Sequence, residues 1–220
     1  MMPFSEILER AIARHSMAEI EAQMPTVLSP TALSATGDDR WLATMAKQIF
    51  RAGFSWKVID AKWPGFEAAF DGFEPRRVAM YADEDLDRLL LDKAIVRNGP
   101  KIRAVIDNAR FLVELADQHG SAGRFLAEWP DDDYVGLLEF LKKRGGRLGG
   151  NTGQMVLRII GKPAFVLSED VSKALIMAGV VDKKPSSKRD MAKAQAAFDA
   201  WAEETGRNLS ELSRILAMSV

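Results

Sequence analysis

Apolar residues recur along this chain mostly at the 3.6-residue period of an amphipathic helix, and almost nowhere at the period of two typical of a strand. One apolar stripe covers residues 4–12. A second covers residues 41–52, with Asp38 and Asp39 ahead of it as candidate N-terminal caps. This pattern predicts an all-α protein of roughly ten short helices joined by loops of a few residues.

The clearest helical pattern begins at Pro100, directly after the turn signal Asn98-Gly99, and Gly120 ends it. Two further helices are predicted near the C-terminus, because residues 187–190 and 208–211 both have the spacing of a capping box. Two stretches have the composition of linkers, residues 26–39 and 182–189.

The charges are nearly balanced, with 30 basic and 31 acidic residues among 220 and a formal net charge of −1. Any nucleic-acid site is therefore expected to be a local patch, because the whole molecule does not attract polyanions. Cysteine is absent, which excludes disulfides, thiolate zinc sites, iron–sulfur clusters and a cysteine nucleophile. The sequence shows no signal-peptide core, and no window approaches the ~18 unbroken apolar residues of a membrane span. We expect a soluble, cytoplasmic protein.

Between residues 137 and 160, two helical patterns flank the glycine-rich run 145–150 (GGRLGG). Glycines let a backbone approach a phosphate closely, and the amides that open the second helix, at Asn151 and Thr152, would point at that phosphate. The pattern is typical of a helix-hairpin-helix that binds DNA, and equally of a plain αα-hairpin with a solvated basic edge. The basic residues around the run are Lys142, Lys143, Arg144, Arg147, Arg158 and Lys162.

A polar side chain interrupts the apolar stripe that begins at Trp41, because Gln48 lies on the same helical face. A buried glutamine must form hydrogen bonds or cost roughly 1–3 kcal/mol, and a backbone group near the end of its helix is the simplest partner. Phe54 and Trp56 follow Gly53, where the helix is expected to stop. Aromatic residues after such a break either fill the core or form a stacking surface.

Three segments carry a resemblance to a known family: residues 52–56 (AGFSW), 66–78 (FEAAFDGFEPRRV) and 92–110 (DKAIVRNGPKIRAVIDNAR). They resemble the DNA-3-methyladenine glycosylase I family, clearly over residues 38–120 and more loosely to about residue 180. The resemblance implies the all-α helix-hairpin-helix DNA glycosylase fold, with two helical lobes and the lesion pocket between them. The family removes 3-methyladenine from alkylated DNA after flipping the base out of the stack.

The resemblance also implies roles for single residues. Trp56 matches the tryptophan that stacks on the flipped base, and Phe54 takes the place of the leucine that wedges into the base stack, beside the small Gly53. Gln48 falls where the family has a glutamate that recognises the adenine edge. A glutamine can pair with adenine N6 and N7 but lacks the charge that favours a cationic base. We predict Gln48 and Trp56 as catalytic and base-binding residues, with Trp41 as a further base-binding residue. The predicted DNA-binding residues are Gly53, Phe54, Lys143, Arg147, Gly149, Gly150 and Thr152.

The family's zinc site uses cysteines and histidines near its termini, whereas Asp170 and Ala174 stand at two of those positions here. We expect no metal and no cofactor, and infer that packing of extra terminal helices replaces the metal. The expected organisation is a single glycosylase-like unit over residues 1–220. Its parts are a core at 38–180, a hairpin at 137–160, and terminal helices at 1–37 and 181–220 that pack as a second lobe.

Three further positions bear on the mechanism that the resemblance implies. Ser168 stands where many helix-hairpin-helix glycosylases have a catalytic aspartate, which the methyladenine family also tends to lack. Glu169 and Asp170 either assist electrostatically or are helix N-terminal acids, which suit the helix dipole. Thr152 stands where bifunctional relatives have a lysine that forms a Schiff base, which predicts hydrolysis without strand cleavage.

The leading interpretation is a monofunctional glycosylase that excises 3-methyladenine from double-stranded DNA containing alkylated bases. Two alternatives stay open. One is a catalytically silent helix-hairpin-helix protein that binds damaged or distorted DNA, and the other is an all-α scaffold whose C-terminal helices bind a protein. Gln48 distinguishes the first two interpretations, and the basic hairpin distinguishes both from the third.

Overall fold

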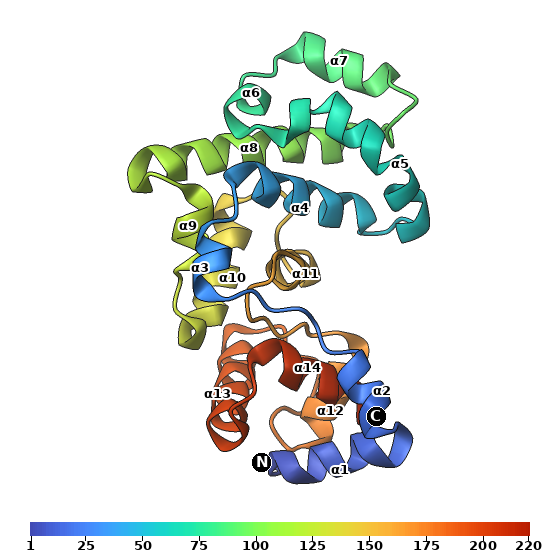
Figure 1. The fold of residues 1–220 in the computed structure, drawn as a ribbon, viewed down its shortest axis with the longest axis vertical. Helices are drawn as coiled ribbons and strands as arrows, with labels where there is room; N and C mark the ends of the chain where they lie inside the picture. Colours follow the sequence, from blue (N-terminus) through green and yellow to red (C-terminus); the bar gives the residue numbers. More distant parts are fainter. The chain divides into compact units, whose positions relative to one another are not determined.

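The computed structural model describes all 220 residues, and they form an entirely helical fold (Figure 1). No residue lies in a β-strand, so the predicted all-α class is confirmed. The helices are α1 (Phe4–Arg14), α2 (Met17–Ala22), α3 (Pro30–Ser34), α4 (Asp38–Arg51), α5 (Trp56–Ala69), α6 (Pro75–Ala79), α7 (Asp83–Leu91), α8 (Gly99–His119), α9 (Ala122–Ala127), α10 (Tyr134–Arg144), α11 (Asn151–Ile160), α12 (Glu169–Met177), α13 (Lys188–Thr205) and α14 (Leu209–Met218). Two 3₁₀ turns complete the set, η1 (Asp71–Phe73) and η2 (Asp131–Asp133).

Fourteen α-helices are present instead of roughly ten. The additional ones are short, and a helix of five or six residues leaves no complete apolar stripe in the sequence. One of them, α3, lies inside residues 26–39, so this predicted linker is partly helical, and it contains the boundary at residues 28 and 29 between two compact units of the chain. The other predicted linker, residues 182–189, contains no helix before Lys188. None of the helices combines the length and the apolar content that a membrane span requires.

The chain divides into two compact units. The first comprises residues 1–28, 130–137 and 157–220, and the second comprises residues 29–129 and 138–156. Helices α1, α2, α13 and α14 therefore share a unit. That unit also takes in residues 157–180, which the sequence pattern assigned to the core, and the second unit takes in residues 29–37. The hairpin between α10 and α11 belongs to the second unit.

In the first unit, the terminal helices pack on one another through aromatic rings. The ring centroid of Phe4 on α1 lies 6.0 Å from that of Trp201 on α13, and Trp201 lies 5.7 Å from Phe198. The Trp201 indole N–H also donates to the Met2 carbonyl at 3.1 Å. These contacts join the first helix of the chain to α13 in one apolar core.

Most of the predicted helix ends are confirmed. The side chain of Asn98 caps α8 at its N-terminus, and Gly120, with a φ of 84°, ends the helix. Residues 208–211 form a complete capping box at the start of α14. At residues 187–190 the Ser187 hydroxyl accepts from the Asp190 N–H, and hydrogen bonding to Ser187 lowers the pKa of the Asp190 carboxyl.

The predicted caps of α4 are wrong. Gly37 is the N-cap residue, while Asp38 and Asp39 lie in the first helical turn. The Asp38 carboxylate instead adds to the N-terminal cap of α9, whose N-cap residue is Ser121: it accepts from the Ser121 hydroxyl at 2.9 Å and from the Gly123 N–H at 2.7 Å. One acidic side chain thus ties the start of α4 to the start of α9, a link between residues 85 positions apart.

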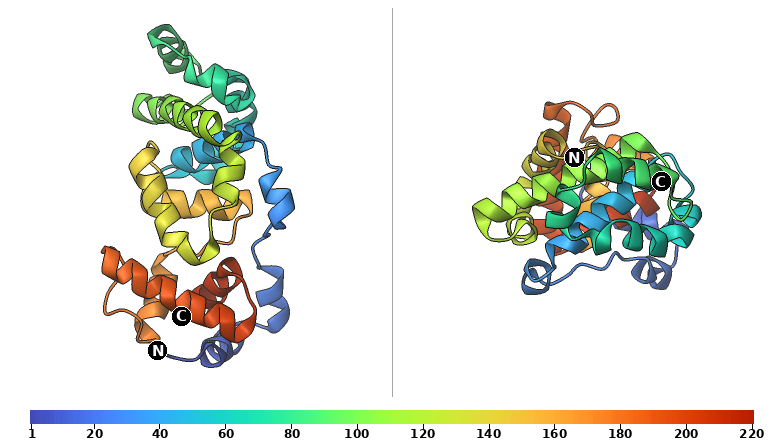
Figure 2. Two further views of the ribbon diagram at one scale, coloured as in Figure 1. Left: turned by 90° about the vertical axis from the view of Figure 1, so that its left-hand side faces the viewer. Right: turned by 90° about the horizontal axis from the view of Figure 1, so that it is seen from above.

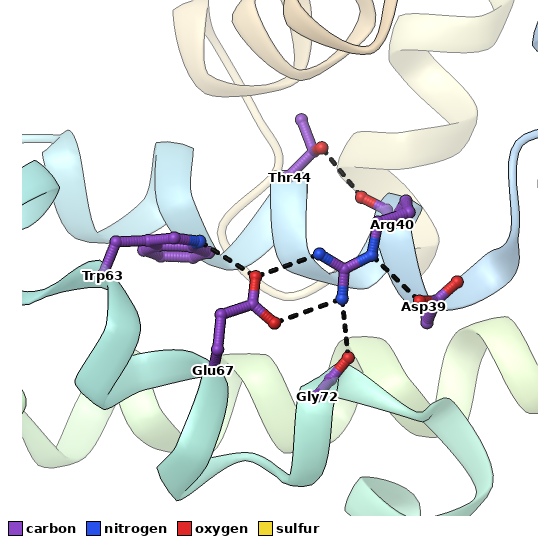
Figure 3. Close-up of polar contacts among 6 residues, drawn as sticks. All are labelled: Asp39, Arg40, Thr44, Trp63, Glu67 and Gly72. Atoms are coloured by element: carbon purple, nitrogen blue, oxygen red, sulfur yellow. Dashed lines mark hydrogen bonds and ion pairs between the residues drawn. The ribbon is translucent and has the colours of Figure 1, made fainter.

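An arginine at the start of α4 binds α5 and η1 (Figure 3). Arg40 donates to both carboxylate oxygens of Glu67, at 3.0 and 3.1 Å, and to the Gly72 carbonyl at 2.8 Å. Glu67 also accepts from the Trp63 indole at 2.9 Å. The hydrogen bonds from Arg40 to Glu67 and Asp39 raise the pKa of its guanidinium. A bidentate pair of this kind fixes orientation as well as distance, so α4 and α5 are held in a defined alignment.

The role of Asp38 leads to a stability prediction. Asp38→Ala removes the acceptor of the Ala122 and Gly123 N–H groups, leaves the Ser121 cap of α9 in place, and is expected to lower the free energy of unfolding by about 0.5–2 kcal/mol. Asp39→Ala is the matched control, since it removes only an exposed pair with Arg40, worth about 0–1 kcal/mol. Urea denaturation followed by circular dichroism measures both. Equal losses of stability in the two variants would contradict the capping role.

Candidate nucleic-acid interface

Gln48 lies on the inner face of α4, one turn before the helix ends. Only 3% of the residue is exposed, and its amide nitrogen Nε2 is enclosed with no hydrogen-bond partner. The backbone partner that the sequence suggested for this amide is therefore absent. An enclosed donor without an acceptor is costly, and such a group in a native protein is commonly explained by a ligand or another functional role.

The chain leaves α4 through a short loop that exposes two aromatic rings. Ala52 is extended, Gly53 has a φ of +73°, and α5 begins at Trp56. The left-handed conformation at Gly53 favours glycine. Phe54 is 44% exposed and Trp56 is 50% exposed, so the two rings do not fill the core. Of the two alternatives for these aromatics, a surface role is the one that fits.

One face of Trp56 is covered by an arginine of α4. The Arg51 guanidinium carbon lies 4.6 Å from the centre of the Trp56 ring, within cation–π distance. Asp60 of α5 accepts from Arg51 at 2.6 and 2.8 Å and pairs with Lys47 at 3.0 Å. Hydrogen bonds from these two cations lower the pKa of Asp60. Arg51 thus packs on one face of the Trp56 ring, while half of the residue's surface stays exposed to solvent.

Trp41 has a different environment from the other predicted base-binding residues. Its side chain is fully buried, and its N–H edge packs so closely against Gly123 of α9 that a Cβ at that glycine would lie 2.6 Å from the ring. The ring has no open face for stacking on a base. Trp41 is a packing residue between α4 and α9 in this structure.

The glycine-rich run forms a tight turn between α10 and α11. Gly150 adopts a φ of +58°, and Arg147 adopts a φ of +59°, which is unusual for a residue with a side chain. Lys143, Arg147 and Gly150 are exposed, whereas Gly149 and Thr152 are half-buried. The turn thus presents charged side chains and accessible backbone at one place on the surface.

Two buried polar residues of α8, which the sequence analysis did not single out, hold these elements. The amide of Asn108 donates to the Gly146 carbonyl at 3.0 Å and accepts from the Gly146 N–H at 2.7 Å, which fixes the hairpin. Lys101 is only 7% exposed, and its ammonium donates to the carbonyls of Phe50 and Ala52. The signal available in the sequence was the pair of polar residues seven positions apart on an otherwise apolar helix face.

The structure therefore places the predicted residues in two groups within the second unit. Gln48, Gly53, Phe54 and Trp56 lie at the junction of α4 and α5, and the remaining predicted DNA-binding residues lie on or beside the hairpin turn. Helix α8 contacts both groups, since it packs alongside α4 (Figure 1, Figure 2) and bonds to the hairpin through its asparagine.

An open pocket of about 460 Å³ lies between α7, the start of α8 and the hairpin. Arg103, Asp107 and Arg147 are its charged lining residues. Neither Gln48 nor Trp56 lines it, so this pocket is separate from the predicted base-recognition residues and borders the hairpin instead.

The acidic residues at the start of α12 have ordinary structural partners. The Ser168 hydroxyl caps the helix by accepting from the Val171 N–H at 3.1 Å. Glu169 pairs with Lys173 at 3.0 Å, and this hydrogen bond lowers the pKa of Glu169. Asp170 is also within 3.9 Å of Lys173. These observations favour helix N-terminal acids over an electrostatic role. No group of three or more His, Cys, Asp or Glu side chains is arranged to hold a metal ion.

Comparisons with known sequences agree with the resemblance. The sequence model of the methyladenine glycosylase family matches residues 33–136. The DNA-3-methyladenine glycosylase 1 of Escherichia coli K12 is 39% identical over 121 residues, which cover 46% of this chain and 64% of that protein. The Haemophilus influenzae DNA-3-methyladenine glycosylase is 28% identical over 60 residues, which cover 27% of this chain and 32% of that protein. The chain thus spans less than two thirds of either curated relative.

Comparisons with solved structures extend the likeness to the fold. A crystal structure of 3-methyladenine DNA glycosylase I matches over 66% of this chain and 86% of its own length, with 25% identity and a TM-score of 0.50. A Methanocaldococcus jannaschii 8-oxoguanine glycosylase/lyase, solved with DNA, matches over 96% of this chain and 94% of its own, with 14% identity and a TM-score of 0.54. The chain has the fold of the helical DNA glycosylases, and residues 33–136, just under half of its length, are similar to the methyladenine glycosylase family.

Proposed function

We propose that this protein is a monofunctional DNA glycosylase that hydrolyses the N-glycosidic bond of alkylated adenine, with 3-methyladenine as its substrate base. The observation that carries the proposal is the enclosed amide of Gln48, which has no partner in the protein and lies one turn before the exposed aromatic loop. The match of residues 33–136 to the methyladenine glycosylase family supports it.

The proposed site divides the work of base flipping among three side chains. Phe54 enters the base stack where the lesion leaves it, and Trp56 stacks on the extruded ring. Gln48 pairs with the adenine edge, its amide N–H donating to N7 and its carbonyl accepting from the N6 amino group. The amide then gains the acceptor that it lacks in the free protein. Trp41 is left out of this set, because its ring is fully enclosed.

The proposed reaction requires the protein mainly to position the base and the attacking water. An N3-alkylated adenine carries a positive charge and leaves readily, so its bond to the sugar breaks as water attacks, and the bonding electron pair neutralises the base. The residues that extrude and hold the base therefore supply the catalysis. Thr152 stands at the position of the Schiff-base lysine of bifunctional enzymes, which supports hydrolysis without strand cleavage.

The hairpin is proposed to bind the DNA backbone. Its exposed side chains Lys143 and Arg147, and the accessible amides around Gly149 and Gly150, suit a phosphate group. Because the whole chain has a net charge of −1, this local patch must supply the electrostatic attraction. Acting on chromosomal DNA, the protein is proposed to work in the cytoplasm of a bacterial cell.

Substitutions of Gln48 and Trp56 test the enzyme proposal in single-turnover release of 3-methyladenine from methylated DNA. Gln48→Ala is expected to lose about 1–3 kcal/mol of discrimination for 3-methyladenine. Gln48→Glu restores a negative charge opposite the cationic base and is expected to preserve or raise the rate. Trp56→Ala removes the stacking surface, at about 1–3 kcal/mol.

The matched control for these variants is Gln118→Ala, which removes an exposed glutamine of α8. It is expected to leave the rate unchanged, with circular dichroism confirming that every variant folds. No excision by the wild type or by Gln48→Glu would refute the enzyme proposal and leave the DNA-binding alternative. Normal excision by Gln48→Ala would show that the base is recognised elsewhere.

The salt dependence of DNA binding tests the hairpin. Arg147→Glu is expected to weaken binding to duplex DNA and to reduce the slope of log K against log salt by about 0.9 for each phosphate that the variant no longer neutralises. Arg10→Glu makes the same charge change at an exposed position on α1 in the other unit and is expected to leave the slope unchanged. Fluorescence anisotropy over a salt series measures both slopes. Identical slopes in the wild type and Arg147→Glu would assign the phosphate contacts to another surface.

A further inference from the structure

We infer that Lys101 is a positioning residue that holds the loop of residues 52–55, and with it the ring of Phe54, in a fixed place relative to the hairpin. The inference rests on the proposed function for its consequence in excision. Lys101 lies near the start of α8, and it contacts neither solvent to any large extent nor any acidic side chain. Its contacts run instead to the end of α4 and to the loop after that helix.

The ammonium of Lys101 binds the end of α4. Its Nζ donates to the Phe50 carbonyl at 3.1 Å and to the Ala52 carbonyl at 2.6 Å. The last carbonyls of a helix have no partner within the helix, and a cation placed there also interacts favourably with the helix dipole. Lys101 therefore fixes the direction in which the chain leaves α4.

The same ammonium faces the exposed aromatic ring of the loop. Its Nζ lies 5.2 Å from the ring centre of Phe54 and 5.8 Å from that of Phe50, both within cation–π distance. Gly53, with its φ of +73°, separates the two anchored carbonyls from Phe54 and has no neighbouring atom within 4 Å of a Cβ position. The backbone of Phe54 is held by its own N–H, which donates to the Arg51 carbonyl at 3.1 Å, and the Lys101 cation adds a contact to the ring itself.

One face of α8 carries both this anchor and the anchor of the hairpin. Lys101, Ala104 and Asn108 are spaced three and four residues apart, so they share a face of the helix. A Cβ at Gly146 would approach the Ala104 backbone to 3.2 Å, and Asn108 makes two hydrogen bonds to Gly146. The two anchors lie about 10 Å apart along a single rigid helix. The position of the loop relative to the hairpin is consequently fixed by α8.

Stability alone does not account for a lysine at this position. Burial, and to a smaller extent the charge of Arg147, lowers the pKa of Lys101, so the folded protein disfavours the charged form. Folding stability is reduced while Lys101 is protonated, and it is regained as the pH rises from the lowered pKa of the folded state to the ordinary pKa of lysine. An apolar side chain of similar volume avoids this cost, but it gives the two carbonyls no donor and removes the cation from the Phe54 ring.

Fluorine NMR of the full chain labelled with 4-fluorophenylalanine tests the restraint without DNA. The eleven phenylalanines give eleven signals, and Phe54→Leu and Phe50→Leu assign the two that face Lys101. Lys101→Met is expected to move the Phe54 signal toward that of the free amino acid and to narrow it, while Lys101→Arg keeps it near the wild-type position. Lys62→Met is the matched control, because Lys62 also donates to a backbone carbonyl, that of Lys93, at 2.6 Å.

Single-turnover excision tests the consequence for function. Lys101→Met is expected to lower the rate of 3-methyladenine release about tenfold or more through misplacement of the loop, with partial recovery in Lys101→Arg. Its affinity for undamaged duplex is expected to stay within about twofold, because the buried ammonium is not a phosphate contact. A purely structural role would lower thermal stability and leave the rate of the folded fraction unchanged.

The two arms separate the failure of this inference from the failure of the proposed function. An unchanged Phe54 signal in Lys101→Met, or the same change in Lys62→Met, overturns the inference whatever the enzyme does. Normal excision by Lys101→Met beside an active wild type also overturns it. An inactive wild type refutes the glycosylase alone, and the NMR arm then decides the restraint. If Lys101→Met does not fold, Lys101→Gln takes its place in both arms.

Discussion

A polar group enclosed in a protein must find a hydrogen-bond partner or cost stability, and three side chains of the second unit meet this constraint in different ways. Asn108 is satisfied by the backbone of Gly146, and Lys101 by the carbonyls at the end of α4. The amide nitrogen of Gln48 has no partner at all. The first two side chains hold the elements proposed to bind DNA, and the third keeps an unused donor, which is proposed to pair with a base.

Electrostatics in this protein are local. The chain is nearly neutral, so the effect of its basic residues depends on where they lie. Arg40 forms a bidentate pair with Glu67, and other basic side chains are exposed around the hairpin. The first arrangement aligns α4 with α5, so that Gln48 and Trp56 keep a fixed separation although they belong to different helices. The second leaves charge free for a ligand. Basic side chains therefore align two helices at the start of α4, and around the hairpin they are proposed to attract DNA.

Two features of charge and packing distinguish this chain within its helical fold. The neutral amide of Gln48 is enclosed on α4, and aromatic contacts between Phe4, Phe198 and Trp201 join the terminal helices. The fold is shared, over nearly the whole chain, with a helical glycosylase/lyase solved with DNA that contains 8-oxoguanine. In the proposed function, recognition of the base depends on a few side chains of α4 and of the loop after it.

The sequence by itself determined the helical class, the ends of α8, the start of α14, the glycine-rich turn and the resemblance to a family, because helical periodicity, caps and short motifs are local properties. The tertiary structure decided the rest. Asp38 caps α9 instead of its own helix, and Trp41 is enclosed against Gly123, since each contacts residues some 80 positions away. Lys101 and Asn108 gain their roles in the same way. A stripe identifies a buried face, but only folding brings together the distant backbone groups and side chains that meet there.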